Sequence, residues 1–254
     1  MNLIEAIEIR RSRRKYNPTP LDTAAVEELR QLIALYSEAA KLRMEFVLDN
    51  GEAFAGFRKS YGMFVGVCHY IAFIASNNDA TSAERLGYYG ELLILHATTL
   101  GLGSCWVGGS FDRASCPFPL SESERIVCAI VVGNTEQQDS VKERIIRSIV
   151  HRKTKSAEEM YDSDTDAPDW FLSGMLAVQK APSAVNRQPV FFSYKEGKVS
   201  AWIDALDELA DDSYALDLGI AKCHFELGTQ GYTADSDVAG SAWTWGNHAG
   251  FVRQ

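Results

Sequence analysis

The sequence lacks the features of an exported or membrane-embedded protein. No apolar run is long enough to cross a membrane, since the longest, Met63 to Ala75, is interrupted by Gly66, Cys68 and His69. The first residues, Met1 to Glu5, lack the basic segment and the apolar run of a signal peptide. We therefore expect a cytoplasmic protein without a membrane partner.

Cysteine motifs, nucleotide-binding glycine motifs and positive charge are also scarce. The chain has 5 cysteines but no C-x-x-C pair, which argues against a disulfide framework or a zinc site. It has no G-x-G-x-x-G after a strand, so a Rossmann nucleotide site is not expected. The formal net charge is −9, and general binding to nucleic acid is disfavoured because that binding depends on neutralising phosphates. Local basic clusters are informative in such an acidic chain.

The rest of the composition is that of a globular protein with mixed helices and strands. The 254 residues, 46% of them hydrophobic and 23% charged, suffice for a sizeable core. Apolar spacing and capping residues predict the elements of the first part of the chain. These are a helix from Asp22 or Thr23 with core positions Val26, Leu29, Ile33 and Tyr36, a strand from Met44 to Leu48, a long helix from Thr81 to about Leu100, and a buried strand from Ile126 to Val132.

The second part of the chain repeats the order of the first. An acidic, polar segment from Met160 to Asp169 connects the two. After it we predict a helix (170–179), a loop (181–189), a strand (190–194), a turn at 196–197, a strand (199–203) and a helix (213–227). The first part has a similar helix, segment and strand between Thr23 and Leu48. This order predicts a distant duplication, with halves at residues 1–158 and 159–254 that together form one globular unit.

Four arginines lie within five residues near the start, in Arg10-Arg11-Ser12-Arg13-Arg14. Their charges repel one another unless solvent or an anion separates them. If Arg10, Arg11 and Arg14 converge on a phosphate, each contact is a charge-assisted hydrogen bond worth about 1.5–3 kcal/mol. Taken alone, the run is more typical of a solvated basic turn.

A loop in the second half, Ala181 to Pro189, combines stiffness with mixed polarity. Two prolines limit its backbone, and Ser183, Asn186 and Gln188 supply both donors and acceptors. That mixture matches a ring edge with alternating N–H and C=O groups, such as the flavin pyrimidine. An ordinary helix-to-strand loop is the alternative, but the buried strand that follows at once favours a binding role.

Two further segments are less specific. The glycines of Gly101 to Gly109 would let backbone approach a flat ligand, with Gly108 or Gly109 donating an amide to a ring nitrogen. A helix end followed by a strand explains the same residues. His151 to Lys155 is a second basic cluster, which either closes over the same phosphate or is a solvated helix end.

Together these segments resemble the flavin-dependent nitroreductase family. Members commonly begin with R-R-S-x-R, carry G-L-G-x-C-W after a long helix, and have a P-S-x-x-N-x-Q-P loop. This chain has Arg10 to Arg14, Gly101 to Trp106, and Pro182 to Pro189. The resemblance spans nearly the whole chain, and it implies an α+β, nitroreductase-like fold.

The order of the motifs departs from the family. Members usually have the Pro-Ser loop soon after the first arginines, where this chain has Tyr36 to Arg43 without proline, asparagine or glutamine. The intact loop lies in the second half. Because members are typically homodimers that bind FMN between subunits, the resemblance implies an intrachain pseudo-dimer. Its two related halves would share one composite cofactor site, and the second site would be lost.

The resemblance also assigns residues to FMN. The phosphate and ribityl chain would be held by the first arginine segment, assisted by a basic pair, and the ring would be lined by the Pro-Ser loop and faced at its redox edge by two glycines. Ala184 stands where many relatives have a second serine. The implied cofactor-binding residues are Arg10, Arg11, Ser12, Arg14, Gly108, Gly109, Lys153, Lys155, Pro182, Ser183, Ala184, Asn186 and Gln188.

The function that the resemblance implies is that of an FMN-dependent NAD(P)H oxidoreductase of the nitroreductase or quinone reductase type. Electrons from NADH or NADPH would reach a small-molecule acceptor in two alternating half-reactions, and no side chain is required as an acid or base. Two alternatives remain: a flavin-binding or sensory protein without turnover, and an anion-binding interaction module.

Overall fold

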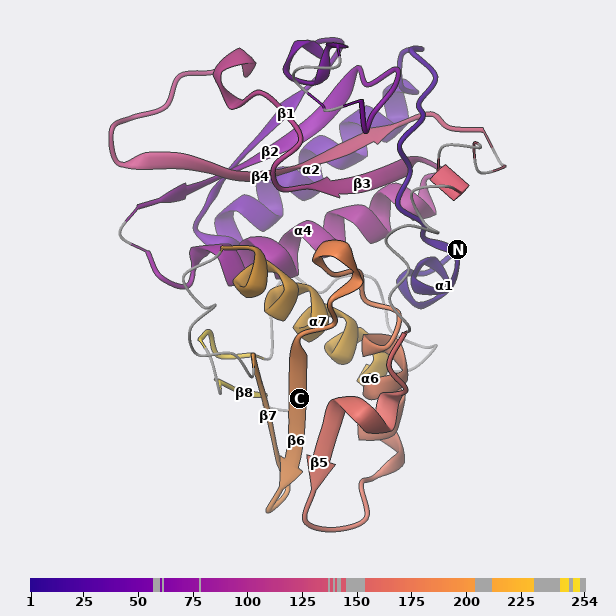
Figure 1. Ribbon diagram of the computed structural model, residues 1–254, viewed down its shortest axis with the longest axis vertical. Helices are drawn as coiled ribbons and strands as arrows, with labels where there is room; N and C mark the ends of the chain where they lie inside the picture. The colour runs from indigo at the N-terminus through magenta and orange to yellow at the C-terminus, as the bar shows by residue number, and fades with distance from the viewer. Residues whose placement is uncertain are drawn as a thin grey trace. The chain divides into compact units, whose positions relative to one another are not determined.

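A computed structural model of the chain describes residues 1–56, 60, 62–77, 79–136, 138, 140, 143–144, 154–203, 212–230, 243–246 and 249–251. They form an α+β fold, as predicted, in two compact units (Figure 1). One unit, here called the arginine unit, consists of Ile9–Ala80 and Leu93–Ile149. The other, called the loop unit, consists of Met1–Glu8, Thr81–Leu92 and Val150–Gln254. Within the described residues, no helix combines the length and apolar character needed to cross a membrane.

The arginine unit is built on an antiparallel four-stranded sheet. The strand order is β1-β2-β4-β3, so β2 and β4 are central. Their residues are almost all buried, as expected of strands covered on both faces. The bounds are β1 Arg43–Val47, β2 His69–Ser76, β3 Gly103–Val107 and β4 Glu124–Gly133.

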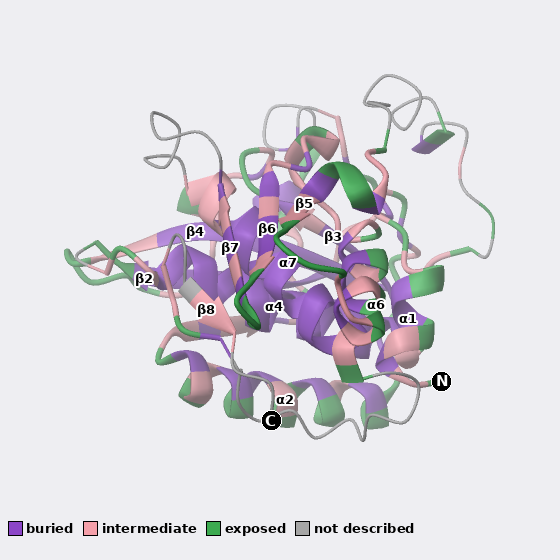
Figure 2. Ribbon diagram, turned by 90° about the horizontal axis from the view of Figure 1, so that it is seen from below, coloured by how far each residue is buried: buried purple, intermediate pink, exposed green. Residues whose placement is uncertain are grey.

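Helix α2 (Thr23–Ala40) covers one face of this sheet. It begins where the sequence predicted, because the Asp22 carboxylate accepts from the amides of Ala24 and Ala25. Leu29 packs with Phe46 of β1 and Val132 of β4 on this face. Figure 2 shows the opposite side of α2 exposed. The other face of the sheet carries short connections that include two 3₁₀ turns, η1 (Glu52–Phe54) and η2 (Arg113–Ser115).

The loop unit has a second four-stranded sheet, in the order β5-β6-β7-β8. Its helices α6 and α7 pack closely through Gly174 and Gly228, where an added Cβ would come within 2.8 Å of Phe225 and 2.7 Å of Ala177. The remaining bounds are α1 Leu3–Ile9, η3 Ala157–Met160, β5 Tyr161–Ser163, α6 Asp169–Val178, η4 Ala184–Asn186, β6 Val190–Lys195, β7 Lys198–Ile203, α7 Asp212–Gln230 and β8 Ala249–Phe251.

The first part of α4 (Ser82–Thr99) crosses α7 at two glycines. A Cβ at Gly87 would lie 2.2 Å from the carbonyl oxygen of Leu216, and one at Gly219 would lie 1.8 Å from that of Glu84. The contact is reciprocal, because each glycine meets the residue three positions before the other glycine. Only glycine permits such an approach of two backbones.

Most of the predicted elements are present. The helices and strands expected at 22–48, 81–100, 126–132 and 170–227 appear within a few residues of their predicted bounds. Strands β2, β5 and β8 were not predicted, whereas β3 agrees with the alternative interpretation of residues 101–109 as a helix end followed by a strand. The compact units are also composed differently from the predicted halves 1–158 and 159–254, since α4 contributes residues to both units. The halves stay a prediction about duplication.

Candidate functional site

The arginine segment, Arg10 to Arg14, lies along the outer edge of β3. Ser12 forms a parallel bridge with Ser104, and the Arg13 amide donates to the Ser104 carbonyl at 2.8 Å. Further along, Lys15 bridges to Val65 in the same way. The segment therefore extends the sheet as a short, irregular edge strand, and its backbone is fixed although it is neither a helix nor a regular strand.

Three of the predicted phosphate ligands converge on one thiol, that of Cys105. Burial raises the pKa of Cys105, whereas the charges of Arg14 and Arg10 and a hydrogen bond with Ser12 act to lower it. Arg11, by contrast, is exposed. The sequence prediction grouped Arg10, Arg11, Ser12 and Arg14, and the structure brings all of these except Arg11 to the same thiol.

Two polar groups in this region are buried without a hydrogen-bond partner among the described residues. They are Nε of Arg14 and Oγ of Ser104. A buried polar atom that lacks a partner costs about 1–3 kcal/mol, and more when it is charged. Native structures rarely keep such atoms, so they indicate an acceptor that the described residues do not supply. For a guanidinium that acceptor is typically an oxyanion.

Arg13 has a different role from its neighbours. It is buried, and its Nε donates to the Glu143 carboxylate at 3.1 Å, while Nη2 donates to the carbonyl of Gln138. Glu143 also accepts the amides of Arg14 and Ser140, both at 2.7 Å. Burial acts to raise the pKa of Glu143, but these hydrogen bonds outweigh it and lower the pKa to about 2. Arg13 and Glu143 thus hold the segment in place.

Sequence reasoning missed Glu143, although a local signal was present. Ser140 and Glu143 have the spacing of a capping box, and they exchange both of its hydrogen bonds. The same carboxylate also accepts hydrogen bonds from the arginine segment, namely from Nε of Arg13 and the backbone amide of Arg14. Nothing in the local sequence indicates this second partner, which is 129 residues away from Arg14.

The turn after β3 contains Gly108 and Gly109, which were expected to face the redox edge of a flavin. Both are exposed, and an added Cβ at either would meet no atom within 4 Å. The Gly108 carbonyl accepts from the guanidinium of Arg113 at 2.5 Å. The turn is therefore anchored on one side and open on the other.

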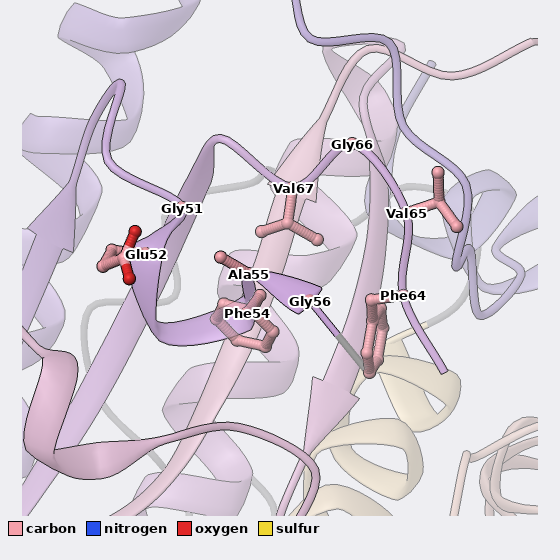
Figure 3. Close-up of a pocket in the computed structure, with 9 residues that line it drawn as sticks. All are labelled: Gly51, Glu52, Phe54, Ala55, Gly56, Phe64, Val65, Gly66 and Val67. Carbon is pink, nitrogen blue, oxygen red and sulfur yellow. The ribbon is translucent and has the colours of Figure 1, made fainter. Parts of the chain in front are cut away.

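A hollow of about 480 Å³ lies in the same unit, between η1 and the segment before β2. Figure 3 shows the rings of Phe54 and Phe64 on two of its sides, with Val67 nearby. Phe54 stacks on Phe111 at 5.5 Å. The wall residue Val65 exchanges backbone hydrogen bonds with Arg14 and Tyr16. The full lining is Gly51, Glu52, Phe54, Ala55, Gly56, Phe64, Val65, Gly66 and Val67.

The Pro-Ser loop, Ala181 to Pro189, belongs to the loop unit and has an unusual backbone. Val185, Asn186 and Gln188 have φ values of 47°, 53° and 50°. Such values are rare outside glycine, and for a β-branched residue such as Val185 they are strained. Strain of this kind persists only where the surroundings determine the conformation, and it often marks functional sites. The side chain of Val185 is nonetheless 56% exposed.

Two sets of contacts determine this conformation. The buried carboxylate of Asp217 accepts the amide of Ala184, at 3.0 Å, and the guanidinium of Arg187, at 3.3 Å. Arg187 also lies 3.8 Å over the ring of Tyr214 and donates to the hydroxyl of Ser213 at 2.8 Å. Neither Asp217 nor Arg187 was among the predicted site residues.

The second set involves Gln188 and Lys155. Gln188 is only 5% exposed. Its backbone N–H donates to the Ser183 hydroxyl, and its side-chain oxygen accepts the backbone N–H of Lys155, both at 2.9 Å. The Lys155 ammonium donates to the Gln188 carbonyl, also at 2.9 Å. Lys155, expected beside a phosphate, is therefore a contact of the Pro-Ser loop. Lys153 lies outside the described residues.

A sequence model of a protein family described as "Putative TM nitroreductase" matches residues 2–229. The chain belongs to the nitroreductase family. A comparison with curated proteins finds no match.

A solved structure described as a nitroreductase shares the fold, and two others match over part of the chain. A protein of Thermotoga maritima described as a "putative nitroreductase" is 22% identical; 90% of this chain and 83% of that one are covered, with a TM-score of 0.60. An "FMN-dependent nitroreductase" of Clostridium difficile is 18% identical, covers 60% of this chain and 99% of its own, and has a TM-score of 0.43. A "putative nitroreductase in complex with FMN" from Desulfovibrio desulfuricans is 20% identical over 56% and 94%, with a TM-score of 0.42.

The predicted site residues thus fall into two groups. Arg10, Arg11, Ser12, Arg14, Gly108 and Gly109 lie in the arginine unit. Lys155, Pro182, Ser183, Ala184, Asn186 and Gln188 lie in the loop unit. That both groups bind one cofactor stays a prediction from the sequence.

Proposed function

We propose that the chain is an FMN-dependent NAD(P)H oxidoreductase that passes electrons from NADH or NADPH to a small-molecule acceptor. The observation that carries this proposal is the buried Nε of Arg14, which lacks a partner among the described residues in a segment where Arg10 and Ser12 also converge. FMN, when bound, supplies the two-electron chemistry, and the protein supplies binding and orientation.

The donor set of the arginine unit suits a phosphate monoester. Two guanidinium groups and a serine hydroxyl offer several donors, and the edge position of the segment fixes their spacing. The Arg13–Glu143 pair holds the backbone of the segment in place. Glu143 contacts Arg14 through its backbone amide and not through its guanidinium. Arg10, Ser12 and Arg14 would hold the phosphate and the ribityl chain, and Arg11, being exposed, would add only a screened charge.

The Pro-Ser loop suits the ring of the same cofactor. Its backbone is held in a strained conformation by Asp217, Arg187 and Lys155 rather than by the ligand. A loop that is already ordered loses little conformational entropy on binding. Pro182 and Asn186 would then line the ring from a fixed position. Gln188 and Ser183 stabilise the loop itself, because the backbone N–H of Gln188 donates to the Ser183 hydroxyl.

We further propose that the two halves are a fused pseudo-dimer. The support is the reciprocal crossing of α4 and α7, in which Gly87 meets Leu216 and Gly219 meets Glu84. Each glycine meets the residue three positions before the other glycine, which is the pattern of a contact about a two-fold axis. Such a contact in one chain is expected after duplication and fusion of a homodimer subunit.

The hollow beside the arginine segment is the place that we propose for the electron acceptor. Phe54 and Phe64 line it but are only 4% and 7% exposed, so Val65 forms its most accessible apolar wall. The backbone of Val65 is hydrogen-bonded to Arg14 and Tyr16 of the segment that would hold FMN. Pockets for small molecules are typically apolar and of about this size. A planar, uncharged acceptor such as a quinone or nitroaromatic fits this lining better than an anion.

The phosphate role of Arg14 has a direct test. The Arg14→Met variant is titrated with FMN and with riboflavin, which has no phosphate, and binding is followed by flavin fluorescence. We expect FMN binding to weaken by about tenfold or more, since a charge-assisted hydrogen bond is lost, while riboflavin binding is unchanged. The control is Arg30→Met on the exposed face of α2. Equal weakening for both flavins would contradict the proposed role.

The alternatives make different predictions. A flavin-binding protein without turnover would bind FMN that NADPH does not bleach. An anion-binding interaction module would show no flavin binding, and its affinity for an acidic partner would fall steeply with salt. The mixed polarity of the Pro-Ser loop favours FMN over a bare anion.

A further inference from the structure

The turn after β3 carries two adjacent glycines that the packing of the protein does not require. An added Cβ at Gly108 or Gly109 would meet no atom within 4 Å, and neither residue has a positive φ. Glycine increases the entropy lost on folding, and it is common where backbone approaches a ligand closely. A ligand whose atoms approach the exposed turn from outside would account for this pair.

Arg113 fixes the orientation of the backbone in the turn after β3. Its Nη2 donates to the carbonyls of Gly108, at 2.5 Å, and Val127, at 3.1 Å, and its Nε donates to that of Ile126 at 3.0 Å. The guanidinium also lies 4.7 Å over the ring of Phe111. A planar fork held at three carbonyls and one aromatic face keeps a single orientation, although the side chain is exposed on one side.

A bulge in β4 makes two of those carbonyls available. The pairing with β2 passes from Phe73–Cys128 to Ile74–Ile126, so Val127 is an extra residue on β4. Strand β3 has ended by then, since its last pair is Val107 with Ala129. A bulge interrupts the ladder of backbone hydrogen bonds and is common beside functional sites. Arg113 supplies the missing donors and links the bulge to the glycine turn.

The direction of the next amide follows from the geometry of the peptide bond. In a trans peptide the C=O of Gly108 and the N–H of Gly109 point in opposite directions. Because Arg113 holds that carbonyl, the Gly109 N–H points away from Arg113, and no described residue accepts it. It is an oriented donor that faces open space.

We propose that Arg113 is a positioning residue that aims the Gly109 amide at N5 of bound FMN. This inference rests on the proposed function. The guanidinium does not touch the cofactor; it acts through the Gly108–Gly109 peptide. Its role differs from that of Arg14, which would contact the phosphate directly.

The test compares two flavins in two variants. In 5-deaza-FMN a carbon replaces N5, so the ring edge has no acceptor for the amide, but the phosphate is retained. The Arg113→Lys variant keeps the charge and loses the fork. We expect its affinity for FMN to fall about three- to tenfold, the value of one hydrogen bond, with no change for 5-deaza-FMN. Gly109→Pro removes the N–H itself and should give the same pattern.

The matched control is Arg125→Lys, because Arg125 also belongs to the β4 region and donates to a backbone carbonyl, that of Ser76 at 3.0 Å. It should change neither affinity. Equal weakening for both flavins would mean that Arg113 is only structural, and unchanged FMN affinity would also overturn the inference. Failure of the wild-type chain to bind either flavin would instead reject the proposed function, and this inference with it.

Discussion

Asp217 accepts the backbone amide of Ala184 with both of its carboxylate oxygens, at 3.0 and 3.2 Å. Asp217 is buried on α7, and Ala184 begins the strained part of the Pro-Ser loop. The same carboxylate accepts the guanidinium of Arg187, which is the residue that follows this strained turn. One side chain therefore holds the turn Ala184–Asn186 within the loop from both ends, and the conformation expected to bind a flavin ring exists before any ligand arrives.

Asp217→Asn should loosen the loop. The amide side chain keeps the size of the carboxylate but loses its charge and one acceptor, so a buried charge-assisted contact with Arg187 is weakened. We expect a loss of about 2 kcal/mol in the free energy of unfolding and a several-fold weaker affinity for FMN. Urea denaturation and flavin titration measure the two effects. The control is the exposed Asp166→Asn. Unchanged FMN affinity in Asp217→Asn would contradict the role of the loop.

Glu143 predicts a dependence of stability on pH. Its pKa is lowered from 4.5 to about 2 in the folded chain, so its stabilisation is complete above pH 4.5 and is lost as the pH falls towards 2. At pH 7, Glu143→Gln should be less stable than the wild type by an amount on the order of 2 kcal/mol. Most of this difference should be lost by pH 2, where the folded-state carboxyl is half protonated.

Denaturant titrations at several pH values measure this difference. Glu136→Gln is a suitable control, because Glu136 pairs with Lys15 at an exposed position. Exposed pairs contribute roughly 0–1 kcal/mol, so little change is expected at any pH. A constant difference between Glu143→Gln and the wild type from pH 7 to pH 2 would rule out the proposed cause.

Gly219→Ala tests the helix crossing. Alanine is favoured over glycine in a helix by about 1 kcal/mol, but here the new Cβ would lie 1.8 Å from the carbonyl oxygen of Glu84. Backbone cannot move aside as a side chain can, so overpacking dominates and we expect a net loss of roughly 2 kcal/mol or more. Gly109→Ala, where an added Cβ meets nothing within 4 Å, should leave stability unchanged. A stabilised Gly219→Ala would refute the close crossing.

The hollow predicts an effect confined to the acceptor. Ala55 is exposed at its rim, so Ala55→Phe should fill the space without disturbing the core. We expect KM for a quinone or nitroaromatic acceptor to rise by roughly tenfold, with FMN affinity and the KM for NADPH unchanged. Ala24→Phe, on the exposed start of α2, is the control. An unaltered KM for the acceptor would exclude this hollow as its site.

The helices could be predicted because each carries its own signal. Asp22 caps α2, and Leu29, Ile33 and Tyr36 mark its buried face. Strand β4 could be predicted from its continuous apolar run. Strand β2 has a similar run, but it follows glycine-rich residues that obscured where it begins, and β5 and β8 have only three residues each. Such short strands are determined by pairing with distant partners rather than by local sequence.

The candidate site divides in the same way. Arg10, Ser12 and Arg14 were identifiable because their motif is local, and the structure groups them around Cys105. The residues that hold the motifs, Glu143 and Asp217, were not identifiable, because each acts on a segment far away in the sequence. A lone acidic residue in a helical pattern is ordinarily exposed, and only the fold shows that these two are buried.

The most direct test of the proposed function is the absorbance spectrum of the purified protein with FMN, before and after NADPH is added without oxygen. We predict a bound-flavin spectrum that bleaches on addition of NADPH and returns when a quinone is supplied. A flavin spectrum that NADPH leaves unchanged, or the absence of any bound flavin, would contradict it.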